Sequence, residues 1–165
     1  MFWSKEKIGG SFASGLNFGL TSAVITTLGL MIGLISGTGL KLAVLGGILT
    51  IAIADALSDA LGMHISKESQ DSRKPKEIWA ATLATFLAKF IFAITFIFPV
   101  LLFDLQSAIL INFVWGALLI TFLSLKIARD QNRRPGKIIG EHLLIAVLVI
   151  ILSYLAGRWI NLTFS

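Results

Sequence analysis

The residues best suited to chemistry lie in one stretch, Ile48 to Gln70, which begins as an apolar run of membrane-spanning length and ends in a charged segment. It carries two carboxylates, Asp55 and Asp59, and a thioether, Met63, each four positions from the last. In a helix this spacing places all three side chains on one face. A charge near the middle of a bilayer costs about 2.5–3.5 kcal/mol on insertion scales, so intramembrane carboxylates indicate an ion or proton pathway by default.

This face offers hard oxygen ligands and a soft sulfur ligand, a combination that divalent first-row metals accept. We therefore expect Asp55, Asp59 and Met63 to be ligands of a transported metal ion. One helix rarely completes a coordination sphere, so further ligands must come from other spans or from a second subunit. Burial favours a protonated carboxylate and a bound cation favours an ionised one. Protons and metal would then compete for the site, which is the basis of an antiporter.

Lys89 is a third charge that we expect inside the membrane. It falls near the middle of the third predicted span, at the depth of Asp55, so we expect these two residues to pair. That pairing would leave Asp59 free to bind a cation or a proton. The alternative is an ion-pair cluster that fixes helix packing and never turns over. Asn17 and Thr21 lie one turn apart on the first span, and we expect both to face the transport path.

The composition places these residues in a membrane protein. The chain has 165 residues, of which 56% are hydrophobic and only 14% charged, and this is too apolar for a soluble domain. Its apolar runs are long enough to cross a hydrocarbon core of about 30 Å, and they are continuous, unlike the strands of a transmembrane barrel. We expect an all-α fold, a single membrane domain over residues 1–165, with spans at about 12–35, 41–65, 77–102, 105–126 and 138–160.

The basic residues gather on one side of the predicted membrane. The N-terminal head and the connectors between spans two and three and between spans four and five hold most of them: Lys5, Lys7, Lys67, Arg73, Lys74, Lys76, Lys126, Arg129, Arg133, Arg134 and Lys137. The positive-inside rule then predicts five spans with the N-terminus inside and the C-terminus outside. This asymmetry accounts for the net charge of +5, so we expect no nucleic-acid partner. The expected location is the cell membrane of a prokaryote.

Other chemistry has little support in the sequence. The chain has no cysteine, which excludes thiolate metal sites and disulfides. It has no HExxH, GxSxG, P-loop or dinucleotide-binding motif, so we expect it not to be an enzyme and to hold no permanent cofactor. Two GxxxG pairs in the first span, Gly15 with Gly19 and Gly29 with Gly33, predict close helix contacts. We expect this glycine-rich span to form a homodimer contact.

Two segments resemble the vacuolar iron transporter family. The segment GLNFGLTS, residues 15–22, is similar to the family's GxxDGLxx in the first span. The segment ADALSDALGMHISKESQ, residues 54–70, is similar to the family's SMxxGEYxSxxSQ at the end of the second span. The resemblance covers the first two spans, and the rest of the chain by its five-span layout alone. It implies a homodimer that exchanges cytosolic ferrous iron or manganese for protons.

The chain departs from the family at the positions that line its path. The acidic residue of the family's first span is replaced by Phe18, and the methionine of its second span by Asp59. Met63 and His64 stand where the family has Glu-Tyr, and residues 66–76 are too few to hold the family's cytosolic helical metal-binding domain. An oxygen and sulfur ligand pair therefore remains, but on one helix instead of two.

These observations predict a proton-coupled carrier that exports a divalent metal cation, ferrous iron or manganese, from the cytoplasm. Fe²⁺ or Mn²⁺ would be its substrate, and its partners would be the lipid bilayer, the metal ion, protons and a second copy of the chain. Two alternatives stay open. One is a non-transporting membrane scaffold or accessory subunit, and the other is a carrier for a non-metal substrate.

Overall fold

The structure is a computed structural model that describes residues 2–70 and 74–164, with side chains from residue 8 onward. Within these residues it is helical apart from short connections and contains no strand. The elements in chain order are α1 (Phe2–Thr38), α2 (Lys41–Thr50), the π-helical turn η1 (Ile51–Asp55), α3 (Ala56–Glu68), α4 (Pro75–Thr95), α5 (Ile97–Leu102), α6 (Leu105–Asp130) and α7 (Pro135–Phe164). α2, η1 and α3 follow one another without a loop and form one long helical segment.

Five helical segments are long and apolar enough to cross a membrane, which confirms the predicted all-α, five-span fold. Their bounds are Ile8–Thr38, Lys41–Glu68, Pro75–Leu102, Leu105–Asp130 and Pro135–Phe164. These apolar segments extend up to four residues beyond the predicted spans, and α1 itself begins further out, at Phe2. The predictions for Lys5, Lys7 and Arg73 lie outside the described side chains.

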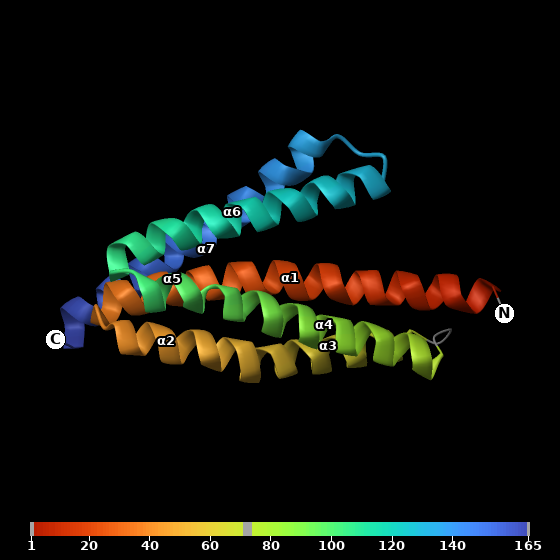
Figure 1. Cartoon of the computed structure of the whole chain (residues 1–165), viewed down its shortest axis with the longest axis horizontal. Coiled ribbons are helices and arrows are strands. Elements are labelled where there is room, and N and C mark those ends of the chain that lie inside the picture. The colour runs from red at the N-terminus through yellow and green to blue at the C-terminus, as the bar shows by residue number, and fades with distance from the viewer. Residues whose placement is uncertain (1, 71–73, 165) are drawn as a thin grey trace.

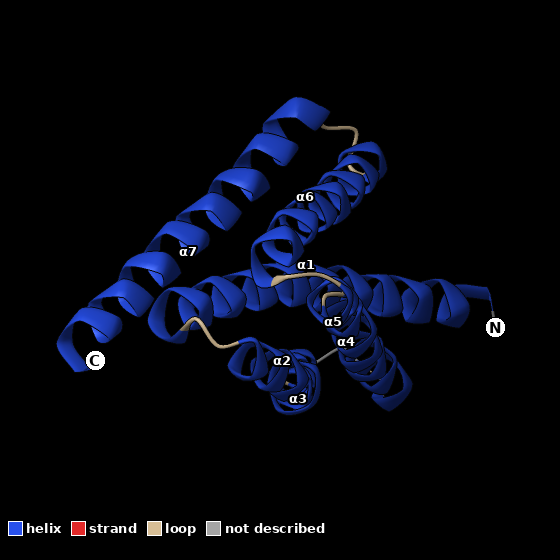
Figure 2. Ribbon diagram, turned by 60° about the vertical axis from the view of Figure 1, so that its left-hand side comes forward, coloured by secondary structure: helices blue, strands red, loops and turns tan. Residues whose placement is uncertain are grey.

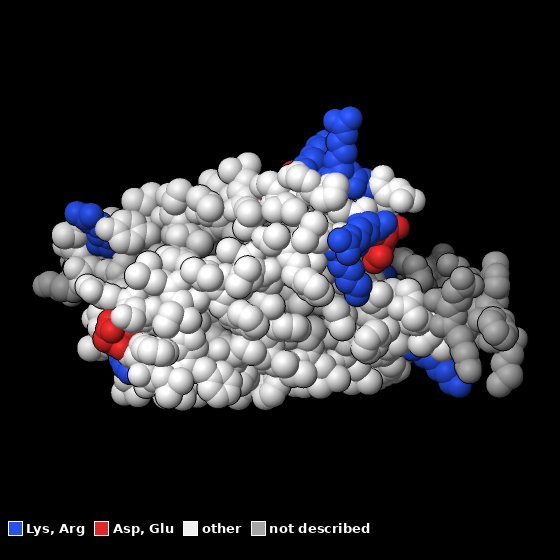
Figure 3. Space-filling model, turned by 45° about the horizontal axis from the view of Figure 1, so that its top comes forward, with Lys and Arg blue, Asp and Glu red and all other residues white. Residues whose placement is uncertain are grey.

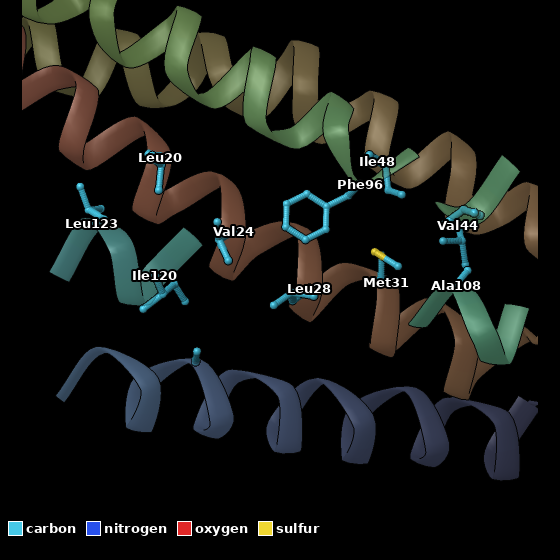
Figure 4. Packing of buried hydrophobic residues seen from close by; sticks show 12 residues of the cluster. Leu20, Val24, Leu28, Met31, Val44, Ile48, Phe96, Ala108, Ile120 and Leu123 are labelled. Atoms are coloured by element: carbon cyan, nitrogen blue, oxygen red, sulfur yellow. The ribbon is translucent and has the colours of Figure 1, made fainter. Parts of the chain in front are cut away.

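α1 is the central helix of the bundle (Figures 1 and 2). It contacts α4 and the α2–η1–α3 segment on one side and α6 and α7 on the other. Its buried side chains include Leu20, Val24, Leu28 and Met31, which pack with residues of α2 and α6 and with Phe96, the residue between α4 and α5 (Figure 4). The two ends of the chain lie at opposite ends of the bundle (Figure 1).

The glycines of α1 allow its neighbours to approach closely. A Cβ atom on Gly15 would overlap the carbonyl of Ala81 in α4, and one on Gly19 would overlap the carbonyl of Thr85. The second glycine pair faces α7, where Gly29 packs against Val149 and Ser153. Both GxxxG pairs are therefore used for packing inside one chain. Helices of the same chain cover these glycines, and a homodimer contact through this span stays a prediction.

Short connections join α1 to α2 and α5 to α6 at the same end of the bundle. Gly39, with a φ of 64°, provides the left-handed residue between α1 and α2. The ammonium of Lys41 donates a hydrogen bond to the carbonyl of Phe103, just after α5, at 2.9 Å. Asp104 caps α6, because its Oδ1 accepts from the backbone N–H groups of Gln106 and Ser107, both at 3.0 Å.

Charged side chains lie at the ends of the molecule and leave a wide uncharged band between them on the face drawn in Figure 3. Large apolar side chains are exposed along the helices, among them Leu57, Leu83, Leu118 and Ile151. Exposed apolar residues over the length of several helices are what contact with acyl chains requires. Three charged residues near the middle of the spans, Asp55, Asp59 and Lys89, are the exception, and they lie together.

Candidate functional site

A cluster of one ammonium and two carboxylates lies between α1, η1, α3 and α4. Lys89 of α4 is the largest fully buried side chain in the described chain. Its Nζ forms a salt bridge with Asp55 at the end of η1 and another with Asp59 of α3, 2.6 Å from Oδ2. Nζ also donates a hydrogen bond to Oγ of Ser22 in α1 at 2.9 Å. The three N–H groups of the ammonium therefore have three oxygen partners on two other helical segments, α1 and α2–η1–α3.

The predicted pairing of Asp55 with Lys89 is confirmed, but the expectation that Asp59 stays free is wrong. Asp59 contacts the same ammonium, and its Oδ2 also accepts a hydrogen bond from Oγ of Ser22 at 2.6 Å. The physical reason is that residues four apart lie one above the other on a helix face. The long side chain of Lys89 reaches between them, so one ammonium bridges both carboxylates.

Ser22 is the member of the cluster that sequence reasoning missed. It closes the segment GLNFGLTS and lies four positions after Phe18, on the same face of α1. The first helix thus provides a hydroxyl one turn beyond the position where the similar family has a carboxylate. That family motif was the one available signal, since a serine in an apolar helix is otherwise common at helix contacts.

Asn17 and Thr21, the two residues of α1 that were predicted to face the transport path, differ in their hydrogen bonding. Thr21 donates its hydroxyl proton to the carbonyl of Asn17 in its own helix, at 2.9 Å. Oδ1 of Asn17 is buried and has no hydrogen-bond partner among the described residues. Among the described residues, the hydrogen bonds between the cluster and α1 are those of Ser22, so the path role of Asn17 and Thr21 stays a prediction.

A row of buried apolar residues, with alanines in its second half, packs the α2–η1–α3 segment against α1 and α4. Val44, Ile48, Ala52, Ala56 and Ala60 are all buried and recur every four positions. An α-helix has 3.6 residues per turn, so such a row rotates by about 40° at each step. The wider π turn η1 in the middle of the row offsets part of this rotation. Asp55 and Asp59, each one position before a buried alanine, consequently lie at the edge of the contact with α4.

The π turn η1 ends at Asp55 itself. The backbone N–H of Ala56 bonds to the carbonyl of Ile51, five residues earlier, which is the hydrogen bond of a π-helix. Single π turns inside α-helices occur frequently at functional sites. The sequence did not predict this feature, because no residue in IAIAD is a helix breaker.

The cluster is buried on one side and open on the other. Lys89 has a side-chain exposure of 0%, whereas Asp55 and Asp59 are 39% and 21% exposed. Two carboxylates and one ammonium carry a formal charge of −1. Acyl chains cannot solvate a partly exposed carboxylate. The open side of the cluster therefore requires water or protein next to it.

Within the described residues, no group of three or more His, Cys, Asp or Glu side chains is arranged to hold a metal ion. Asp55 and Asp59 provide carboxylate oxygens, and Ser22 adds a hydroxyl. Met63 is half-buried one turn beyond Asp59 on α3. Its role as a soft ligand stays a prediction.

Each histidine links two neighbouring helices through a hydroxyl. Nδ1 of His64 in α3 lies 3.0 Å from Oγ1 of Thr82 in α4, and the Thr82 hydroxyl donates to the carbonyl of Ile78. A hydroxyl has one proton, and with that of Thr82 assigned to Ile78 the neutral imidazole of His64 would donate through Nδ1. The ring of His64 also packs edge-on against Trp79, with centroids 4.9 Å apart.

His142 of α7 has the same arrangement with α6. Its Nδ1 lies 2.8 Å from Oγ of Ser124, and that hydroxyl donates to the carbonyl of Ile120 at 2.6 Å. Both rings are therefore held through Nδ1. Their hydrogen-bond partners within the described residues, Thr82 and Ser124, lie outside the ion cluster.

The chain matches no protein-family model, no curated protein and no solved structure. The resemblance to vacuolar iron transporters rests on its two segments, and membership of that family stays a prediction.

Proposed function

We propose that the protein is a proton-coupled carrier that exports a divalent metal cation, ferrous iron or manganese, from the cytoplasm. The observation that carries this proposal is the ammonium of Lys89, fully buried between Asp55 and Asp59 within three apolar helical segments. Such a cluster in a membrane protein is a functional hypothesis by default, because the same contacts could be replaced by apolar packing at lower cost.

The charge of the cluster supports cation binding. One ammonium neutralises one of two carboxylates, so a formal negative charge is left over at Asp55 and Asp59. In a medium of low dielectric an unpaired charge attracts a counter-ion far more strongly than in water. A proton or a metal cation would satisfy that charge, and the two would exclude each other. This competition is the physical basis of the proposed exchange.

The available donors agree with the proposed substrate. Asp55, Asp59 and Ser22 offer oxygen atoms, and Met63 would add a thioether from the same face of α3. Fe²⁺ and Mn²⁺ accept oxygen donors, and the softer of the two tolerates sulfur. Because the Lys89 ammonium lies against the same oxygens, it would have to withdraw as the metal ion binds.

The distribution of charge supports an orientation of the protein in the membrane, and export from the cytoplasm is part of the proposal. The positive-inside rule predicts that the connectors after α3 and α6 lie in the cytoplasm and the C-terminus outside. The proposed location is the cell membrane of a prokaryote. A homodimer remains part of the proposal, and its contact would cover the open side of Asp55 and Asp59, since the glycine pairs of α1 are occupied within the chain.

A second candidate function has an observation in its favour. All three N–H groups of the Lys89 ammonium have oxygen partners, which is the geometry of a closed structural ion pair. On that reading the protein is a non-transporting scaffold or accessory subunit. The partial exposure of Asp55 favours the carrier, because a purely structural pair gains nothing from an open side.

The test is a transport assay with purified protein in liposomes that contain a pH-sensitive dye. Ferrous or manganous ion is added outside, and proton movement is followed in the wild type, Asp55→Asn and Asp59→Asn. The matched control is Glu141→Gln, which removes one carboxylate from an exposed pair with Lys137. We expect metal-driven proton flux in the wild type and the control, and its loss in both cluster variants.

Other outcomes would contradict the proposal. Unchanged flux in Asp59→Asn would rule out that residue as the coupling carboxylate. An absence of ion movement under every imposed gradient, with correctly folded protein, would favour the scaffold. Cluster-dependent flux of a compound other than a metal would indicate a non-metal carrier.

A further inference from the structure

The end of α6 carries a cavity that is separate from the ion cluster. Phe122, Leu125, Lys126, Arg129 and Asp130 line a volume of about 310 Å³. The first four positions follow the spacing i, i+3, i+4 and i+7, so they form one face of the helix. An apolar surface and a cationic surface, which together suit an amphipathic ligand, are therefore on one side of α6.

This face changes from apolar to cationic along the helix axis. Phe122 is 71% exposed, and Leu118, one turn earlier, is 58% exposed. Lys126 and Arg129 follow Phe122 at about 6 Å and about 10 Å along the axis, from the rise of 1.5 Å per residue. A phospholipid has the same order, with its acyl chains in the hydrocarbon and its phosphate at the surface.

The cations at this end have few partners within the protein. Lys137 pairs with Glu141 at 3.8 Å. In the part of the chain that the structure describes, Lys126, Arg129, Arg133 and Arg134 form no salt bridge. Figure 3 shows several groups of basic side chains toward one end of the molecule and fewer at the other. Clustered Lys and Arg next to the cytoplasmic end of a span attract anionic lipid headgroups.

We propose that this cavity binds one anionic phospholipid of the inner leaflet. Lys126 and Arg129 contact its phosphate, and Phe122 with Leu125 contacts the first part of an acyl chain. A zwitterionic lipid lacks the net negative charge, and inorganic phosphate lacks the acyl chain. This inference is independent of the metal carrier function.

The experiment uses the full chain in detergent micelles, titrated with phosphatidylglycerol or phosphatidylcholine, and counts bound lipids by native mass spectrometry. The test variant is Lys126→Gln with Arg129→Gln. The matched control is Arg133→Gln with Arg134→Gln, which removes the same charge outside the cavity. We expect the test variant to lose preference for phosphatidylglycerol by about 10-fold or more, and the control to keep it.

Phe122→Ala keeps every charge and tests the apolar half of the site. It is expected to weaken phosphatidylglycerol binding, and it serves as the test if the double glutamine variant does not fold. Equal losses in the two double variants would overturn the proposal, because they would indicate diffuse surface attraction. Displacement of the lipid by an equal concentration of inorganic phosphate would also overturn it, because the ligand would then be a free anion.

Discussion

The Nζ atom of Lys89 lies 2.6 Å from Oδ2 of Asp59, a residue 30 positions earlier in the chain. The same carboxylate oxygen accepts the hydroxyl of Ser22, so it joins α1, α3 and α4 at one point. A carboxylate in this position has two effects. It fixes the relative depth of three helices, and it shares its charge with an ammonium that also holds Asp55.

Removal of the ammonium should cost more stability than removal of either carboxylate. Lys89→Met leaves Asp55 and Asp59 facing each other without a cation, whereas Asp55→Asn or Asp59→Asn leaves one neutral ion pair. Loss of one partner from a buried pair costs about 3 kcal/mol or more, less where the partner is partly exposed. Thermal unfolding of the purified variants measures the difference.

The double variant Lys89→Met with Asp59→Asn is the control for this prediction. It removes one charge of each sign, so it should recover part of the stability that Lys89→Met alone loses. A Lys89→Met protein as stable as the wild type would show that the cluster contributes no net attraction.

Ser22→Ala should weaken the cluster where Thr21→Ala does not. The Ser22 hydroxyl donates to Asp59 and accepts from Lys89, whereas the Thr21 hydroxyl bonds only to a carbonyl of its own helix. Loss of a hydrogen bond to a charged group costs about 1.5–3 kcal/mol. We expect a lower melting temperature for Ser22→Ala, measured beside Thr21→Ala. Equal effects of the two substitutions would contradict the role of Ser22.

Gly19→Leu should destabilise the single chain, whatever its oligomeric state. The added side chain would meet the carbonyl of Thr85 and force α1 away from α4. Overpacking of this kind costs about 1–3 kcal/mol, and more where backbone must move. Gly46→Leu is the control, because no atom lies within 4 Å of a Cβ there. Size-exclusion chromatography after heating distinguishes unfolding from the loss of a dimer with intact chains.

The contribution of Asp104 to stability should decrease in acid. The side-chain hydrogen bond with Ser107, together with the backbone N–H groups of Ser107 and Gln106, lowers the pKa of Asp104 below its usual value of 3.8. A carboxyl whose pKa is lower in the folded state stabilises the fold above its unfolded pKa. That stabilisation is lost as the pH falls through the folded pKa.

Asp104→Asn keeps a good helix cap without a titrating group. The difference in melting temperature between the wild type and Asp104→Ala should shrink from about pH 7 to about pH 3, while the difference between Asp104→Asn and Asp104→Ala stays constant. A constant difference for the wild type would contradict the role of the ionised cap.

The imidazole of His64 should carry its proton on Nδ1, as should that of His142. Nitrogen-15 NMR of the labelled full chain distinguishes the two tautomers directly. His64→Asn keeps an N–H donor near the position of Nδ1, whereas His64→Leu removes it at a cost of about 1 kcal/mol. We expect the asparagine variant to be the more stable. An Nε2 proton on His64 at neutral pH would contradict the hydrogen-bond assignment.

Hydropathy alone predicts the spans, because the length of an apolar run and the thickness of a bilayer determine them. Helical periodicity also predicts that Asp55 and Asp59 share a face. Lys89 and Asp55 both fall near the middle of their spans, and this equal depth in the membrane predicts that they pair. Periodicity does not say which neighbouring helix a face meets. The rotation of α1 depends on Gly15 and Gly19 against the carbonyls of α4, and this contact decides that Ser22 points to the cluster instead of Thr21.

The position of η1 has a consequence for movement. A π turn holds one residue more than an α-helical turn, and this surplus residue can move along a helix without breaking the chain of hydrogen bonds at either end. If it passed from before Asp55 to beyond Asp59, both carboxylates would swing by about 100° around the helix axis. The ammonium of Lys89 would then lose both carboxylate partners at once, through a local rearrangement of one helix and with the other four segments at rest.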